Sequence, residues 1–353
     1  MPKRSLQFLL VVLTAAAALG GLAFYGEPAV AQTTRPAASP TPPPDDDDEI
    51  IRVDSEVVNV LFTAQDRNRR LLTDLRASDI RLLEDGVPQE VTTFSRQVDL
   101  PLSLAILIDV SVSQERTLPE EKAAAIAFLD TVIRPSKDEV AIISFTGEAT
   151  LEQGMTNNLT RLRRAIERVR FTPPAGYLGG GVMGPTPPIS DRGTMLQGST
   201  AIWDSIWVTA DEILGPAPES TRRAIILLSD GVNTSGKKKL DDAVNAALRS
   251  EAIIYSIGIG DNYYSGVDKG SLNKISERTG GRAYFPRDEA QLRQAFRQIQ
   301  EEMRSQYLVA YEPTNQKRDG SYRRIEIQLA NQQLQRDKVR LTHRQGYFAK
   351  SVN

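Results

Sequence analysis

Four continuous, mainly apolar runs constrain the fold of this chain more than any other feature. They span residues 102–108, 140–145, 224–228 and 253–259. A strand with both faces buried needs such a run, whereas a half-exposed strand alternates apolar and polar residues. Residues 125–133 have helical apolar spacing, and Thr117 with Glu120 predicts a capping box before them. This strand–helix repetition predicts an α/β fold with a doubly wound, mostly parallel sheet.

The segments on either side of this region follow a different pattern, with apolar residues at every second position. Val58, Val60 and Phe62 share one face of a predicted strand, and a similar alternation recurs at residues 325–329. Asp85-Gly86 predicts a hairpin turn in the first of these segments. Neither segment has enough strands to close a sandwich alone. We therefore expect residues 50–98 and 306–349 to form one discontinuous β-sandwich, with residues 99–305 inserted between them.

The first fifty residues predict export. Residues 1–31 combine a basic start, an apolar stretch and a small-residue cleavage site at Ala29-Val30-Ala31, as a secretory signal peptide does. Residues 32–49 are rich in Pro and end in an acidic run, which predicts a disordered linker. We expect an exported protein in the periplasm, at the cell surface or secreted. The alternative is an uncleaved signal that acts as an N-terminal membrane anchor.

The composition excludes several kinds of chemistry. The chain has no cysteine, so disulfides, thiol catalysis and cysteine-bound zinc are excluded. Its formal net charge of −2 gives no electrostatic case for binding nucleic acid. His343 is the single histidine and lies among strand-like residues, so we do not expect it to act as a catalytic base.

Three short segments place oxygen-bearing side chains at one edge of the predicted sheet. Asp109-x-Ser111-x-Ser113 follows the first apolar run, Ser229-Asp230-Gly231 ends the third, and Gly198-Ser199-Thr200 opens a helix between them. Open α/β sheets bind ligands at the carboxyl ends of their strands. Carboxylate and hydroxyl oxygens suit a divalent cation such as Mg²⁺. A Ser-rich turn that caps a helix is the alternative for the first segment alone, but the joint occurrence favours a metal site.

These three segments resemble the metal-binding loops of a von Willebrand factor A-type domain with its metal-ion-dependent adhesion site. The second loop is matched by Thr200 and the Ala-Ile-Trp-Asp that follows it. Other phrases are similar to those of a bacterial exported subset of the family, at residues 83–86, 137–141, 255–258, 279–285, 305–307 and 344–347.

The resemblance implies a ligand set. Asp109, Ser111 and Ser113 would hold the metal directly or through water. Thr200 would add a ligand when a partner is bound, and Asp230 would contact the ion directly or through a water. The expected metal is Mg²⁺, with Mn²⁺ or Ca²⁺ as alternatives. A carboxylate of a protein partner would complete the coordination shell.

The chain departs from the family pattern at two places. Val112 stands where many members have Gly, so we expect an extended backbone there, because a β-branched residue is strained at positive φ. A Pro/Gly-rich insertion, residues 172–199, precedes Thr200. Thr194 within that insertion is the alternative to Thr200, but only Thr200 is followed by the matching phrase.

Three functions remain open at this level. The favoured one is an exported, non-enzymatic binding or adhesion module that captures a protein through a metal bridge. The second is a structural or assembly component of the cell envelope with a vestigial metal site. The third is a metal-assisted hydrolase, which lacks an identifiable general acid or base.

Overall fold

The computed structural model describes residues 57–96, 99–171, 173, 177–179, 182–183, 199–260 and 266–351. These residues belong to one compact unit, 53–353. The predicted signal peptide and linker, Thr194 and most of the insertion lie outside the described residues. Within the described part of the chain, no helix has the length and apolar character that a membrane span requires.

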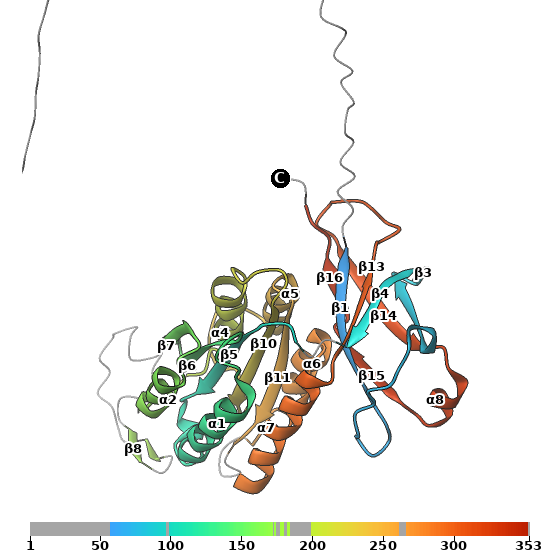
Figure 1. Cartoon of the computed structure of the whole chain (residues 1–353). Helices are drawn as coiled ribbons and strands as arrows, with labels where there is room; N and C mark the ends of the chain where they lie inside the picture. Colours follow the sequence, from blue (N-terminus) through green and yellow to red (C-terminus); the bar gives the residue numbers. More distant parts are fainter. Residues whose placement is uncertain are drawn as a thin grey trace, which may run out of the picture. The chain divides into compact units, whose positions relative to one another are not determined.

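The central sheet contains six strands in the order β12-β11-β10-β5-β6-β7 (Figure 1). All neighbouring pairs are parallel except β6 with β7, which is antiparallel. The four predicted runs form β5, β6, β10 and β11, which confirms the predicted α/β fold. The strands are β5 (Leu102–Asp109), β6 (Glu139–Phe145), β7 (Ala149–Thr156), β10 (Arg222–Ser229), β11 (Ala252–Gly258) and β12 (Ala283–Tyr284).

Helices cover both faces of this sheet, which explains why its central strands are buried and mainly apolar. On β5, Leu104 and Ile106 pack into the core under α1, α2 and α7, whereas Ala105 and Leu107 pack into the core under α4, α5 and α6. A π-helical turn, η3 (Thr209–Leu214), extends α4. The helices are α1 (Leu118–Val132), α2 (Leu159–Arg168), α4 (Ile202–Val208), α5 (Leu240–Arg249), α6 (Lys269–Thr279) and α7 (Glu289–Arg304).

Two four-stranded antiparallel sheets lie outside the central sheet, and each contains strands from both ends of the chain. One has the order β15-β1-β13-β4 and the other β16-β14-β2-β3. Their inner faces share one apolar core. This confirms the predicted pairing of the N- and C-terminal segments. The strands are β1 (Val58–Gln65), β2 (Ile80–Glu84), β3 (Val87–Gln89), β4 (Val91–Arg96), β13 (Tyr307–Tyr311), β14 (Tyr322–Leu329), β15 (Arg340–His343) and β16 (Gly346–Phe348).

A buried polar cluster links the two ends of the chain inside this core. Glu84 of β2 accepts hydrogen bonds from the hydroxyls of Tyr311 and Tyr347, at 2.7 and 2.9 Å. The guanidinium of Arg323 lies 3.4 Å from the same carboxylate, and both side chains are buried. An ion pair inside an apolar core needs further hydrogen bonds to offset its desolvation. The two tyrosine hydroxyls supply them to Glu84, whereas the buried Nε of Arg323 has no hydrogen-bond partner among the described residues.

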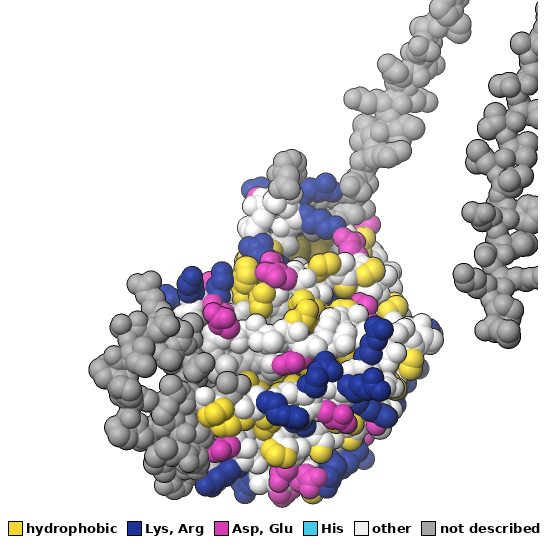
Figure 2. Space-filling model, turned by 90° about the vertical axis from the view of Figure 1, so that its left-hand side faces the viewer, with side chains coloured by type: hydrophobic (Ala, Val, Ile, Leu, Met, Phe, Trp, Pro, Cys, Tyr) yellow, Lys and Arg dark blue, Asp and Glu magenta, His cyan; other side chains and the backbone are white. Residues whose placement is uncertain are grey.

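Short elements complete the described chain. Asp85 and Gly86 adopt positive φ angles of 49° and 83° between β2 and β3, as a type I′ hairpin turn requires. On the face shown in Figure 2, Lys and Arg side chains lie among Asp and Glu side chains, as the near-zero net charge leads one to expect. The minor elements are η1 (Ala77–Asp79), η2 (Val112–Gln114), α8 (Gln332–Arg336) and a small pair of strands, β8 (Tyr177–Gly179) with β9 (Val182–Met183).

Candidate metal centre

Asp109 and Ser229 lie side by side at the carboxyl edge of the central sheet. They are the last residues of β5 and β10, which are neighbouring parallel strands. The Ser229 hydroxyl donates a 2.6 Å hydrogen bond to Asp109 Oδ2. Ser229 was expected only as part of the motif around Asp230, and its role in orienting Asp109 was not predicted.

The loop after β5 brings its two serines against the aspartate. The backbone N–H of Ser111 donates to Asp109 Oδ1 at 2.9 Å, and the hydroxyls of Ser111 and Ser113 lie 3.1 Å apart. Val112 begins the short helical turn η2. Its backbone avoids positive φ, but it does so as part of a turn and not in the extended conformation that we expected.

Asp230 joins the same cluster from the loop after β10. Its Oδ1 accepts a 2.9 Å hydrogen bond from the backbone N–H of Val232. The Ser113 side chain lies close enough to oppose the rise in the pKa of this carboxyl group. Four of the five predicted ligand residues are therefore connected by hydrogen bonds or lie in contact in one place: Asp109, Ser111, Ser113 and Asp230.

Thr200 lies at the same edge of the sheet but is held only through its backbone. Its N–H donates to the Thr234 hydroxyl at 2.8 Å, and its carbonyl accepts from the N–H groups of Thr234 and Ser235. The next residue, Ala201, donates to the carbonyl of Thr146, directly after β6. Among the described residues, the Thr200 hydroxyl makes no hydrogen bond to the other four side chains.

Two further residues support these loops and were not predicted. The Asn233 side chain accepts hydrogen bonds from the N–H groups of Ile202 and Trp203, so it caps α4 directly after Thr200. Gln114 is fully buried and donates to the carbonyl of Ile259, which ties the first loop to the end of β11. An Asn three residues after Asp230 is the sequence signal that could have identified the first of these.

Burial sets the electrostatics of the centre. Desolvation, reinforced by the charge of Asp230, raises the pKa of Asp109 to about 7, against the opposing hydrogen bonds from Ser111 and Ser229. Desolvation also raises the pKa of Asp230. Two carboxyl groups that lose solvation and repel each other are costly to ionise together.

A third buried acid lies close enough to be affected by the charges of both aspartates. Glu121, in the first turn of α1, is fully buried, and neither of its carboxylate oxygens makes a hydrogen bond within the described residues. The nearby Thr117 hydroxyl is directed to Gln114 at 2.8 Å. Desolvation first, then the charges of Asp109 and Asp230, raises the pKa of Glu121 to about 8.

The donor set fits a hard divalent cation. It consists of carboxylate and hydroxyl oxygens, the ligands that Mg²⁺ and Ca²⁺ prefer. A cation would offset the repulsion that raises the pKa of Asp109. Within the described residues, no group of three or more His, Asp or Glu side chains is placed to hold a metal, so the hydroxyls have to supply part of any coordination shell.

His343 is part of the sandwich and not of this edge. Its Nε2 accepts from the N–H of Ile327 at 3.2 Å, so its Nδ1 donates to the carbonyl of Arg344 at 2.7 Å. Burial lowers the pKa of His343, which favours the neutral ring that these bonds require. His343 therefore lies in β15, which confirms the expectation of a sheet residue.

Comparison with solved structures finds weak overall likenesses. Proximal thread matrix protein 1 from the mussel byssus matches at 17% identity and a TM-score of 0.46, over 63% of this chain and 51% of that chain. A structure of the same mussel protein with a zinc-occupied MIDAS motif matches at 18% identity and 0.45, over 63% and 50%. An aerotolerance-related membrane protein from Bacteroides fragilis matches at 16% and 0.42, over 57% and 99%.

The match to the mussel protein spans about half of that protein's length. No sequence among the curated proteins matches this chain.

A family comparison is more direct. Residues 189–298 match the model of the von Willebrand factor type A domain, a range that includes Thr200, Asp230 and the strands β10 and β11. Asp109 and its loop precede the matched range, and the sheet places them beside it through the pairing of β5 with β10. The chain therefore contains a von Willebrand factor type A domain.

Proposed function

We propose that this protein is an exported, non-enzymatic binding module that captures a protein partner through a divalent metal ion. The metal would be held by Asp109, Ser111, Ser113 and Asp230, and a carboxylate of the partner would complete its coordination. One observation supports the proposal most directly. The loops after β5 and β10 meet at one edge of the sheet, and they bring together the buried carboxyl groups of Asp109 and Asp230, both of which have raised pKa values.

The chain's own residues have distinct roles in this scheme. Ser229 and the Ser111 backbone orient the Asp109 carboxylate. The Val232 N–H fixes Asp230. The Thr200 hydroxyl makes no hydrogen bond to the other four side chains, so it is available to bind the metal ion when a partner is also bound. When bound, the cation supplies a positive centre for an acidic group of the partner.

The first test replaces Asp109 with asparagine. Asp109→Asn keeps the side-chain size and removes the charge, so we expect Mg²⁺ binding to weaken by at least about 100-fold, or about 2.7 kcal/mol. Calorimetric titration with Mg²⁺, Mn²⁺ and Ca²⁺ measures the effect. Pull-down from the native cell envelope, in Mg²⁺ and in chelator, then shows whether partner capture is lost together with the metal.

Asp138→Asn is the matched control. Asp138 is also a buried aspartate, but it lies at the amino end of the sheet, where it accepts from the Leu102 N–H at 3.0 Å and pairs with Arg134. We expect it to reduce stability and leave Mg²⁺ affinity unchanged. Equal Mg²⁺ heats for the wild type and Asp109→Asn would disprove the metal site. Retained partner capture without metal would favour a structural role in the envelope.

Thr200→Val tests the separate role of the second loop. We expect Mg²⁺ affinity to change by less than about threefold, because the hydroxyl is not joined to the other ligand residues. Partner capture in the pull-down should fall sharply. If Thr200→Val abolishes Mg²⁺ binding as Asp109→Asn does, the hydroxyl binds the ion without a partner and its assigned role is wrong.

A further inference from the structure

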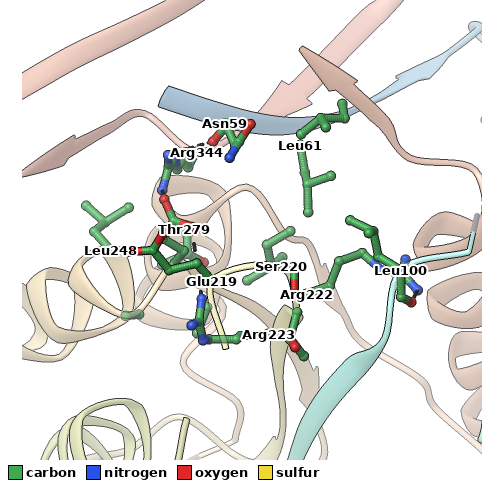
Figure 3. A pocket seen from close by; sticks show the side chains of 16 residues that line it. Asn59, Leu61, Leu100, Glu219, Ser220, Arg222, Arg223, Leu248, Thr279 and Arg344 are labelled. Carbon is green, nitrogen blue, oxygen red and sulfur yellow. Dashed lines mark hydrogen bonds and ion pairs between the residues drawn. The ribbon is translucent and has the colours of Figure 1, made fainter. Parts of the chain in front are cut away.

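A cavity of about 230 Å³ lies at the opposite end of the central sheet, between that sheet and the strands of the sandwich (Figure 3). Arg222 and Arg223 enter it from the start of β10, and Asn59 and Leu61 enter it from β1. Its apolar walls come from both sides: Leu61, Leu100, Leu248, Ile253 and Leu308. It is remote from the metal edge, which lies at the carboxyl ends of the same strands.

Three buried guanidinium groups line this cavity. Arg344 binds Glu251 Oε1 at 2.9 Å and the carbonyl of Asn59 at 2.7 Å. Arg223 lies 4.0 Å from the same glutamate. Figure 3 shows Arg344 beside Asn59 and Arg222 beside Leu100. Arg222, Arg223 and Arg344 are each less than a tenth exposed.

Arg222 has no acidic partner within the described residues. Its guanidinium donates to the carbonyls of Met303 and Leu100 and to the side-chain oxygen of Gln306. Its Nε, like that of Arg344, is buried without a hydrogen-bond partner. Desolvation, with the nearby charge of Arg134, lowers the pKa of Arg222. The charge of Asp138 opposes this shift but forms no ion pair with Arg222. A buried cation without an ion-pair partner is costly to the folded state.

The charges around the cavity do not balance. Glu251 is shared by Arg344 and Arg223. Glu219, the other acid on the lining, is almost fully exposed and pairs with Lys350 at 3.5 Å. The wall therefore keeps an excess of buried positive charge next to five apolar side chains. A ligand that complements it has one negative group and an apolar body.

We propose that this cavity binds a small aliphatic carboxylate, with its headgroup toward the arginines and its chain among the leucines of the two domains. The carboxylate supplies the counter-charge that Arg222 lacks. The chain fills apolar space between β1, β13 and the start of β11, so the ligand ties the sandwich to the central sheet. The same chemistry occurs in a free fatty acid and at the C-terminus of a peptide that ends in an apolar residue.

The test is a calorimetric and thermal-unfolding titration of the full-length protein with hexanoate, hexanol, hexylamine and acetate. We expect hexanoate to raise the melting temperature and to bind at least about tenfold more tightly than the other three. N-acetyl-Ala-Ala-Leu, added as a separate probe, distinguishes a peptide terminus from a free acid by which of the two binds more tightly. Equal binding of hexanol and hexanoate, or no binding of any probe, would overturn the proposal.

A carboxylate could also bind at the metal edge, so the titration is repeated in chelator and with Asp109→Asn. We expect hexanoate binding to survive both. Its loss in either would assign the effect to the metal edge and overturn the proposal.

Two variants probe the cavity itself. Arg222→Met removes the cation that has no ion-pair partner. The ratio of the affinity for hexanoate to the affinity for hexanol should then fall to about one. Leu61→Phe narrows the apolar part of the cavity and leaves the arginines in place. It should weaken the binding of hexanoate at least about tenfold and leave the melting temperature of the ligand-free protein unchanged. Arg163→Met, at an exposed ion pair with Asp130, is the control and should change neither property.

Discussion

In metal-free buffer the protein should lose stability as the pH rises from about 5 to about 8. The cause is the raised pKa of Asp109, about 7, and of Glu121, about 8, compared with ordinary values of 3.8 and 4.5. At a pH between the unfolded-state and folded-state pKa values of these two acids, the folded state binds more protons than the unfolded state. The free energy of unfolding therefore falls with rising pH. Between pH 5 and its pKa of about 7, Asp109 alone accounts for about 3 kcal/mol, at about 1.4 kcal/mol for each pH unit.

Urea unfolding at several pH values, with and without Mg²⁺, measures this effect. Mg²⁺ should flatten the dependence, because a bound cation stabilises the ionised aspartate. Asp109→Asn and Glu121→Gln should each flatten this pH dependence in metal-free buffer and raise the urea midpoint at pH 8.

The acids with lowered pKa values, such as Asp66 and Asp241, do not affect this window, because they lose their stabilising effect only below about pH 4. Stability that is constant or rises from pH 5 to 8 without metal would contradict the expectation.

Glu84→Ala should destabilise the protein by about 3–5 kcal/mol. The substitution leaves the buried guanidinium of Arg323 without its counter-charge and two tyrosine hydroxyls without their acceptor. Because Glu84 lies on β2 and its partners lie on β13, β14 and β16, the loss should affect the whole sandwich. The change in urea midpoint, at unchanged slope, gives the free energy.

Asp130→Ala provides the comparison. It breaks the ion pair with Arg163, at 2.6 Å, but both side chains are more than a third exposed. Exposed pairs contribute roughly 0–1 kcal/mol. If Glu84→Ala and Asp130→Ala lowered the free energy of unfolding by similar amounts, the buried cluster would have no special role in stability.

The sequence predicted the architecture because burial leaves a clear pattern. The strands β5 and β10 are buried at every position because helices cover both faces of the sheet, and this burial leaves a long, mainly apolar run in each. β7 was not predicted, because this antiparallel edge strand reads as a mainly polar segment with exposed positions. The order of the strands depends on contacts between distant segments, which periodicity does not record.

The sequence also predicted part of the candidate centre. Asp109 and Asp230 were recognisable because each directly follows or ends a strand. Glu121 was missed, since an acid in the first turn of a helix normally faces water. The predicted capping box is wrong: Thr117 is the N-cap residue but makes no side-chain cap, and its hydroxyl bonds Gln114 instead. The ligand roles of all five residues and the boundaries of the two domains stay predictions.

The pairing of β1 with β13 has a consequence for how the chain is made. Phe62 lies opposite Tyr307, and about 245 residues separate them, so a ribosome adding roughly 5–20 residues per second needs roughly 12–50 s to produce the second partner after the first. Throughout that interval β1 lacks its neighbours β13 and β15, and β2 lacks its neighbour β14. Newly made chains are therefore most prone to aggregation before the final strands emerge, and a holdase that covers residues 57–96 would protect them during synthesis.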